Sequence, residues 1–298
     1  MIHPSYPFKS HFLTLNGLEY HYLDEGRGEP VVMVHGNPTW SFYYRNLVKA
    51  LRSAYRVVVP DHIGCGLSDK PADSYYSFTL QQRVDDLEAL LESLDIRDNI
   101  TLVLHDWGGM IGMAYAHRHP QRIARLVILN TAAFHLPAAK PLPLALKICR
   151  ETQLGAFLVQ GLNLFALTAA RIGCKRHPMP ADLRQAYCYP YRTWHDRLAI
   201  LRFIQKIPLA PGDSGYQLVT EVEADLEQFA ATPMIICWGE RDFVFDRHFL
   251  AEWRRRFPMA EVHAFPDCGH YILEDAEEEV IPLIGTFLKE HPPGKAQG

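Results

Sequence analysis

The sequence VLHDWGGM at residues 103–110 brings an apolar segment to a polar residue, Asp106, and continues with two glycines. Residues 100–104 form the apolar run of a buried strand, and residues 109–118 have the pattern of a helix. We therefore predict a strand, a sharp turn and a helix, with Asp106 at the apex of the turn. A carboxylate there is already ionised at neutral pH and can attack saturated carbon or a strained ring. The alternative is that Asp106 only caps the following helix.

Strands and helices alternate along most of the chain on both sides of this turn. Residues 11–23 alternate around Asn16-Gly17, which predicts a hairpin. Strands are expected at 30–34, 56–59, 100–104, 123–129, 233–238 and 261–265, and helices at 40–51, 80–94, 109–118, 247–257 and 276–289. This alternation predicts an α/β fold with a mostly parallel, doubly wound sheet.

The alternation is interrupted after Asn130. The following residues, up to about 225, are helix-like, contain many prolines and aromatic residues, and show no clear parallel strand. We interpret them as a helical cap domain inserted into a parallel-sheet core. The expected division is a core of residues 1–133 and 226–290, a helical cap at 134–225 and a disordered tail at 291–298.

The composition restricts the possible partners and location. The 298 residues carry a net charge of −4, which argues against nucleic acid as a partner. The six cysteines form no CxxC pair and no signal peptide is recognised, so a reducing cytoplasm is expected. Cys268 lies close to His270 but lacks further ligands, and neither a metal nor another cofactor is predicted. The longest apolar stretch, 154–170, is short for a membrane span and is expected to be a core or lid helix, with an interfacial helix as the alternative.

Polar residues follow several predicted strands, at the edge where α/β sheets place their active sites. The turn at Asp106 resembles the nucleophile elbow of α/β-hydrolases, whose apex is normally Ser and whose catalytic base comes last in the chain. His270 is the candidate base. Asn130 is not an acid, so the residue that orients the base should follow strand 233–238. Asp242 is our prediction, with Glu240 as the lesser candidate.

An earlier loop, His35-Gly36-Asn37-Pro38, should lie beside the same turn because it follows strand 30–34. Enzymes of this kind need N–H donors where negative charge develops on oxygen. One donor comes from the residue after the nucleophile and another from this earlier loop. The backbone N–H groups of Trp107 and Asn37 are the candidates.

Three motifs resemble the haloalkane dehalogenase group of α/β-hydrolases: HGNP (35–38), DHIGCGLS (61–68) and HDWGG (105–109). The resemblance implies that the side-chain amide of Asn37 and the indole N–H of Trp107 bind a leaving halide. Epoxide hydrolases share the Asp-Trp-Gly elbow but usually have an aromatic or apolar residue in place of Asn37. Three cap tyrosines leave epoxide opening as an option, since it needs phenol donors. These are Tyr187, Tyr189 and Tyr191.

A closer resemblance extends over nearly the whole chain, including the cap. The runs PDHIG (60–64), QRVDDL (82–87), NTAAF (130–134) and RFIQ (202–205) are similar to the bacterial β-lactone decarboxylases of long-chain olefin biosynthesis. That family converts a cis-3,4-dialkyl β-lactone into a cis-alkene and CO2. The resemblance implies the β-lactone synthetase and the reductase of the pathway as partners, in an assembly that can be associated with a membrane.

The cap is expected to bound an apolar tunnel for two alkyl chains. Its predicted lining includes Phe157, Phe165, Trp194 and Phe203. The main hypothesis is a cytoplasmic β-lactone decarboxylase that uses Asp106, and the sequence leaves open whether the lactone carbonyl or the ring carbon is attacked. The alternatives are a haloalkane dehalogenase, which would hydrolyse an ester at the same carboxylate, and a ligand-binding protein without catalysis.

Overall fold

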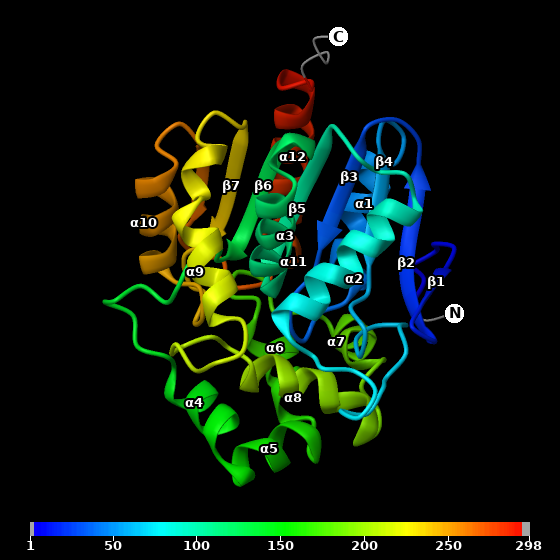
Figure 1. Ribbon diagram of the computed structural model, residues 1–298, viewed down its shortest axis with the longest axis vertical. Helices are drawn as coiled ribbons and strands as arrows, with labels where there is room; N and C mark the ends of the chain where they lie inside the picture. Colours follow the sequence, from blue (N-terminus) through cyan, green and yellow to red (C-terminus); the bar gives the residue numbers. More distant parts are fainter. Residues whose placement is uncertain (1–2, 294–298) are drawn as a thin grey trace.

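The computed structural model describes residues 3–293 and contains an eight-stranded sheet in the order β1-β2-β4-β3-β5-β6-β7-β8 (Figure 1). The strands are β1 (His11–Leu15), β2 (Leu18–Gly26), β3 (Pro30–Val34), β4 (Arg56–Pro60), β5 (Ile100–Asp106), β6 (Ile123–Thr131), β7 (Met234–Gly239) and β8 (Glu261–Phe265). Strand β2 pairs antiparallel with β1 and β4, and the other neighbouring pairs are parallel. The prediction of a mostly parallel, doubly wound sheet is confirmed.

Helices cover both faces of this sheet (Figure 1). One face packs against α2 (Leu80–Ser93), α3 (Trp107–Arg118), α9 (Tyr216–Ala224) and α10 (Arg247–Arg256). The other face packs against α1 (Arg45–Leu51), α11 (Ile272–Asp275) and α12 (Glu277–Glu290). Short 3-10 turns are η1 (Ser41–Tyr44), η2 (Pro120–Arg122), η3 (His195–Arg197) and η4 (Leu226–Phe229).

The central strands are apolar on both sides because each side meets a separate hydrophobic core. In β3, Val32 and Val34 belong to one core, while Val31 and Met33 belong to the other. Successive side chains of a strand point to opposite faces, so a strand covered by helices on both faces becomes a continuous apolar run. This explains why continuous apolar runs in the sequence predicted the positions of the buried strands.

The antiparallel edge begins with the predicted hairpin. Asn16 and Gly17 both have positive φ values, 50° and 83°, between β1 and β2. This backbone geometry matches the tight turns that join two twisted strands, and Asn-Gly is the pair that adopts it most readily. The hairpin prediction is therefore confirmed.

Six helices lie between β6 and β7 in the sequence, and the first five of them lie beyond the carboxyl ends of the parallel strands (Figure 1). These five are α4 (Leu144–Glu151), α5 (Gln153–Gln160), α6 (Leu164–Ile172), α7 (Ala181–Cys188) and α8 (Leu198–Gln205). A third, small hydrophobic cluster holds α5, α6 and α8 together. The division into core and cap stays a prediction. Helix α9, which falls within the range predicted for the cap, shares the hydrophobic core of α3.

Two further expectations concern the C-terminal tail and the apolar stretch of the cap. Of the predicted disordered tail, only residues 291–293 are described, and the prediction for 294–298 lies outside the described residues. Among residues 3–293, no single helix is long and apolar enough to cross a membrane. Helices α5 and α6 pass the same length and composition test only as a pair, and they are bent by 69° relative to each other.

Candidate active site

Asp106 is the last residue of β5 and directly precedes α3. Its backbone has φ 53° and ψ −126°, a strained conformation, and its side chain makes no capping hydrogen bond to the helix. The interpretation of Asp106 as a simple helix cap is therefore contradicted. Gly108 permits the sharp turn, since a Cβ atom there would lie 1.9 Å from the carbonyl oxygen of Val34. The turn aims the carboxylate at the carboxyl edge of the sheet, where it is 7% exposed.

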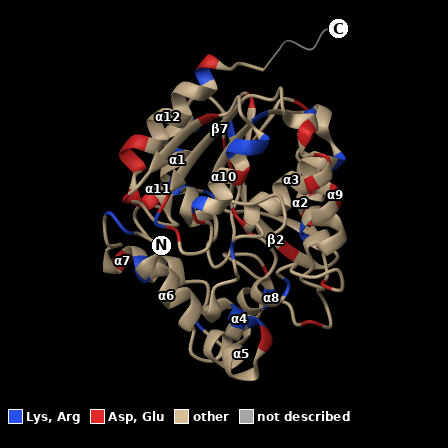
Figure 2. Cartoon of the chain, turned by 90° about the vertical axis from the view of Figure 1, so that its left-hand side faces the viewer, with Lys and Arg blue, Asp and Glu red and all other residues tan. Residues whose placement is uncertain are grey.

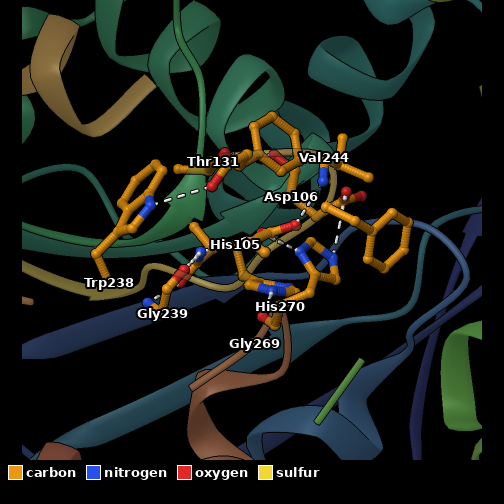
Figure 3. A network of polar contacts seen from close by, with 12 residues as sticks. His105, Asp106, Thr131, Trp238, Gly239, Val244, Gly269 and His270 are labelled. Atoms are coloured by element: carbon orange, nitrogen blue, oxygen red, sulfur yellow. Dashed lines mark hydrogen bonds and ion pairs between the residues drawn. The ribbon is translucent and has the colours of Figure 1, made fainter. Parts of the chain in front are cut away.

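Two loops bring His270 and Asp242 together next to Asp106, and Figure 3 shows His270 beside Asp106. Nε2 of His270 lies 3.6 Å from Oδ2 of Asp106, and Nδ1 of His270 donates to Oδ2 of Asp242 at 2.7 Å. All three side chains are almost completely buried. Glu240 is exposed. The arrangement is that of a nucleophile, a base and an orienting acid.

The pKa values of His270 and Asp106 are shifted by their neighbours in the cluster. Burial by itself lowers the pKa of His270, but the neighbouring carboxylates of Asp242 and Asp106 raise it above the usual value for imidazole. Burial raises the pKa of Asp106, which His270 and the backbone N–H groups of Asn37 and Trp107 oppose. The imidazole of His270 and the backbone N–H groups of Asn37 and Trp107 therefore favour the charged form of Asp106 in this buried site.

The predicted donors lie on both sides of Asp106. The backbone N–H of Asn37 donates to Oδ1 of Asp106 at 2.6 Å. The side-chain amide of Asn37 donates to the carbonyl of Ile200 in α8 at 3.2 Å, which ties this loop to the cap helices. The indole of Trp107 faces the cavity described below and packs against Phe203 at 5.2 Å between ring centroids. Both residues can therefore reach a group that leaves from a bound substrate.

Two further polar residues belong to the site, although neither was predicted as a catalytic residue. Asn130 was considered only as a missing acid, but its side-chain amide donates to Oδ2 of Asp242 and to the carbonyl of Gly239, each at 3.0 Å. His105 donates from Nε2 to the carbonyl of His270 at 2.9 Å, and burial lowers its pKa well below the usual value. The available signal was their position at the ends of β5 and β6, next to the catalytic edge.

We predict that Asn130→Ala lowers kcat roughly tenfold, the effect of losing a buried hydrogen bond to a charged group. The carboxylate of Asp242 would keep its bonds from the backbone N–H of Val244 and from Nδ1 of His270, but Oδ2 would lose its second donor. Steady-state kinetics together with thermal unfolding test this. A variant whose kcat falls only in proportion to its folded fraction would show that Asn130 serves the fold alone.

A narrow cavity of about 90 Å³ opens from the cluster toward the cap helices. Asp106, Trp107 and His270 lie at its polar end. The remainder is mostly apolar and includes Leu142, Leu146, Phe165, Ile204, Phe245 and Phe249. Such a cavity suits a hydrophobic ligand with one reactive polar group. Within residues 3–293, no group of three or more His, Cys, Asp or Glu side chains could hold a metal ion.

The structure places only one of the four predicted lining residues at the cavity. Phe165 lines the cavity, whereas Phe157 and Trp194 are 49% and 53% exposed and pack near each other on the outer surface. Phe203 is buried behind Trp107 and does not reach the cavity. The error has a simple cause: aromatic content marks a helix as apolar but does not say which of its faces meets the cavity.

The cap tyrosines do not form the phenol pair that epoxide opening needs. Tyr187 donates to Glu274 at 2.6 Å, and Tyr191 donates to the carbonyl of Thr39 at 3.2 Å. Tyr189 is partly exposed. None of the three lines the cavity among the residues that the structure describes. The option of an epoxide hydrolase loses its support.

The fold and the geometry at Asp106 define an α/β-hydrolase. The sequence matches the family described as "alpha/beta hydrolase fold" over residues 29–277, and the chain belongs to that family and, within it, to the family of the cis-3-alkyl-4-alkyloxetan-2-one decarboxylases. The decarboxylase of Shewanella oneidensis is 63% identical over 95% of this chain and 89% of its own length. That of Xanthomonas campestris pv. campestris is 47% identical over 98% of this chain and 100% of its own length.

Solved structures of haloalkane dehalogenases share the fold. A mutant form of haloalkane dehalogenase DatA from Agrobacterium tumefaciens C58 superposes with a TM-score of 0.85 and 25% sequence identity, covering 96% of this chain and 99% of its own. The resemblance to the β-lactone decarboxylases, within the wider dehalogenase group, is therefore confirmed.

Proposed function

We propose that this enzyme decarboxylates cis-3-alkyl-4-alkyl β-lactones to cis-alkenes and CO2 in olefin biosynthesis. The observation that carries the proposal is the 63% identity to a decarboxylase of this name over 95% of the chain. The site agrees with it, since a carboxylate stands at the polar end of a mostly apolar cavity. We further propose a cytoplasmic enzyme that works beside the β-lactone synthetase and the reductase of the pathway.

The proposed catalytic residues are Asp106 as nucleophile, His270 as its charged partner and Asp242 as the acid that orients His270. Asp106 attacks the ring carbon that bears the lactone oxygen, so that a new C–O bond forms while the ring C–O bond breaks. The lactone oxygen becomes part of a free carboxylate, whose negative charge develops near the indole N–H of Trp107 and the amide of Asn37. Relief of ring strain drives this step.

The second step needs no water. The C–C bond to the new carboxylate breaks, CO2 leaves, and the electron pair forms the alkene while the carboxylate of Asp106 departs. Inversion at the attacked carbon followed by anti elimination gives a cis-alkene from a cis-lactone. The positive charge of His270, 3.6 Å from Asp106, favours release of this carboxylate as an anion.

Product analysis tests the proposal. A synthetic cis-dialkyl β-lactone labelled at the carboxyl carbon is incubated with the enzyme, and the products are separated by gas chromatography and mass spectrometry. We expect a cis-alkene and labelled CO2 at a rate well above that of the lactone without protein. A β-hydroxy acid as the sole product would contradict decarboxylation.

Haloalkane dehalogenation is the second candidate, favoured by the similarity to dehalogenase DatA and by Trp107 next to Asp106. It would form an ester between the alkyl group and Asp106, which water must then hydrolyse with His270 as base. Halide release from bromoalkanes is the direct measurement. Brisk halide release together with no reaction of the lactone would replace the first proposal with this one.

The apolar cavity predicts a dependence on chain length. We expect kcat/KM to rise with each added CH2 group by up to about fourfold, equivalent to about 0.8 kcal/mol per buried CH2, until the cavity and its opening are filled. Phe165→Ala should extend the range of accepted chains, because it enlarges the lining. A series of lactones of increasing chain length is the measurement. The same kcat/KM across the series would argue against burial of the alkyl chains.

A further inference from the structure

The outer surface of the cap helices is unusually apolar. Of the thirteen large hydrophobic side chains that are exposed within residues 3–293, ten lie between residues 144 and 194. We call the part of this surface on three consecutive helices the cap patch. It consists of Leu144 and Ile148 on α4, Leu154 and Phe157 on α5, and Leu164, Leu167 and Ile172 on α6. Single exposed apolar residues are common on proteins, but a contiguous group of this kind marks an interaction surface.

Two of these helices, α4 and α6, also line the cavity. On α4, Leu146 lines the cavity while Leu144 and Ile148 are exposed. On α6, Phe165 and Ala169 line the cavity while Leu164 and Leu167 are exposed. Helices α4 and α6 therefore carry apolar side chains toward both the cavity and the outer surface, and of the two α6 is apolar over nearly its whole length. A helix that is apolar all round is expected within a core or in contact with lipid.

The charges around the cap patch point to an anionic lipid surface. Residues 152–170 contain no charged side chain, and residues 140–180 contain six Lys or Arg and one Glu. Three of these cations, Lys147, Arg171 and Lys175, are exposed and form no ion pair with any residue that the structure describes. In Figure 2 the ribbons of α5 and α6 are almost entirely tan at the end of the molecule opposite the C-terminus. Basic residues around an apolar face are typical of helices that lie in the headgroup region.

We propose that the cap patch binds the surface of an anionic lipid bilayer, with α4, α5 and α6 lying in the headgroup region. The 69° bend between α5 and α6 and their short lengths fit helices that lie in the interface rather than cross it. The location also has a consequence for catalysis, which rests on the proposed function. A dialkyl lactone and its alkene product are both poorly soluble in water. A cavity close to the lipid lets them enter and leave the enzyme without passing through water.

Vesicle flotation with the full chain tests this surface. Vesicles of phosphatidylglycerol and phosphatidylethanolamine are compared with vesicles of phosphatidylcholine alone. We expect the wild type to float with the anionic vesicles and the variant Leu154→Gln/Leu164→Gln/Leu167→Gln to lose roughly tenfold or more of this binding, because its apolar face is interrupted. Phe12→Gln/Met259→Gln is the matched control: both residues are exposed and apolar but lie outside the cap, so this variant should float like the wild type.

The three exposed cations near the cap patch, Lys147, Arg171 and Lys175, allow a second measurement. Each of the changes Lys147→Gln, Arg171→Gln and Lys175→Gln should weaken binding to the anionic vesicles by roughly fivefold and leave binding to phosphatidylcholine unchanged. The proposal is overturned if the wild type does not float, or if the triple leucine variant floats as well as the control. It is also overturned if the leucine changes alter only the oligomeric state, because the cap patch would then be a contact between protein chains.

Activity measurements separate this proposal from the proposed function. With lactone supplied in anionic vesicles, the triple leucine variant should show a raised KM and an unchanged kcat. With lactone in detergent micelles, its kinetics should equal those of the wild type. An enzyme that floats but does not decarboxylate the lactone in either form would contradict the proposed function and leave the lipid-binding surface intact.

Discussion

Asp106→Ala is expected to abolish turnover of the lactone, with kcat reduced by on the order of 10^6, the scale found when a catalytic nucleophile is removed. The physical reason is that both proposed steps form or break a bond to this carboxylate. No other carboxylate can replace it: Asp242 is occupied by His270 and Asn130, and Glu240 is exposed. The measurement is alkene formation under single-turnover conditions.

The Asp106→Ala protein should remain folded. Burial raises the pKa of Asp106, which means that the fold holds its ionised carboxylate at a cost in free energy. Loss of the carboxylate should therefore not lower Tm substantially, and circular dichroism and thermal unfolding check this. A folded variant that still forms alkene at a tenth of the wild-type rate would refute the assignment of Asp106 as nucleophile.

Asp242→Asn should reduce kcat by about 10^4, the cost of losing the acid that orients a catalytic histidine. Asp242 accepts the hydrogen bond from Nδ1 of His270 at 2.7 Å, and its charge is the largest influence that raises the pKa of this imidazole. With Asn in its place, the pKa of His270 should fall. The positive form of His270 would then be lost at a lower pH than in the wild type, which a histidine titration followed by NMR can detect.

Glu240→Gln is the matched control for Asp242→Asn. Glu240 lies two residues earlier in the same loop, carries the same charge and is exposed. We expect it to leave kcat and the titration of His270 nearly unchanged. A large loss of activity in Glu240→Gln with little effect in Asp242→Asn would mean that the other carboxylate of this loop orients the base.

Much of the fold could be predicted because its signals are local. A strand between two helical layers is a continuous apolar run, and Asn16-Gly17 adopts the positive φ values of a tight turn with little strain. Each predicted parallel strand lies within two residues of its observed bounds. The place of Asp106 was also predictable, because a polar residue followed by two glycines at the end of such a strand permits a sharp turn into a helix.

The catalytic cluster could be predicted only in part. Parallel strands all end at one edge, so residues after β5, β7 and β8 must approach one another, and His270 and a carboxylate from 240–242 were expected there. The choice between Glu240 and Asp242 depended on the path of one loop. Asn130 was set aside because it is not an acid, yet its amide holds Asp242 in place from the neighbouring strand.

The sequence by itself determined the fold class, the order of strands and helices, and the position of the reactive carboxylate, because periodicity and turn chemistry act over a few residues. The tertiary structure decided which aromatic side chains line the cavity and which are exposed on the outer surface. Phe165 lines the cavity, whereas Phe157 and Trp194 are on the outside. A helix that is apolar all round has no preferred inner face of its own, so its orientation follows from packing against residues far away in the chain.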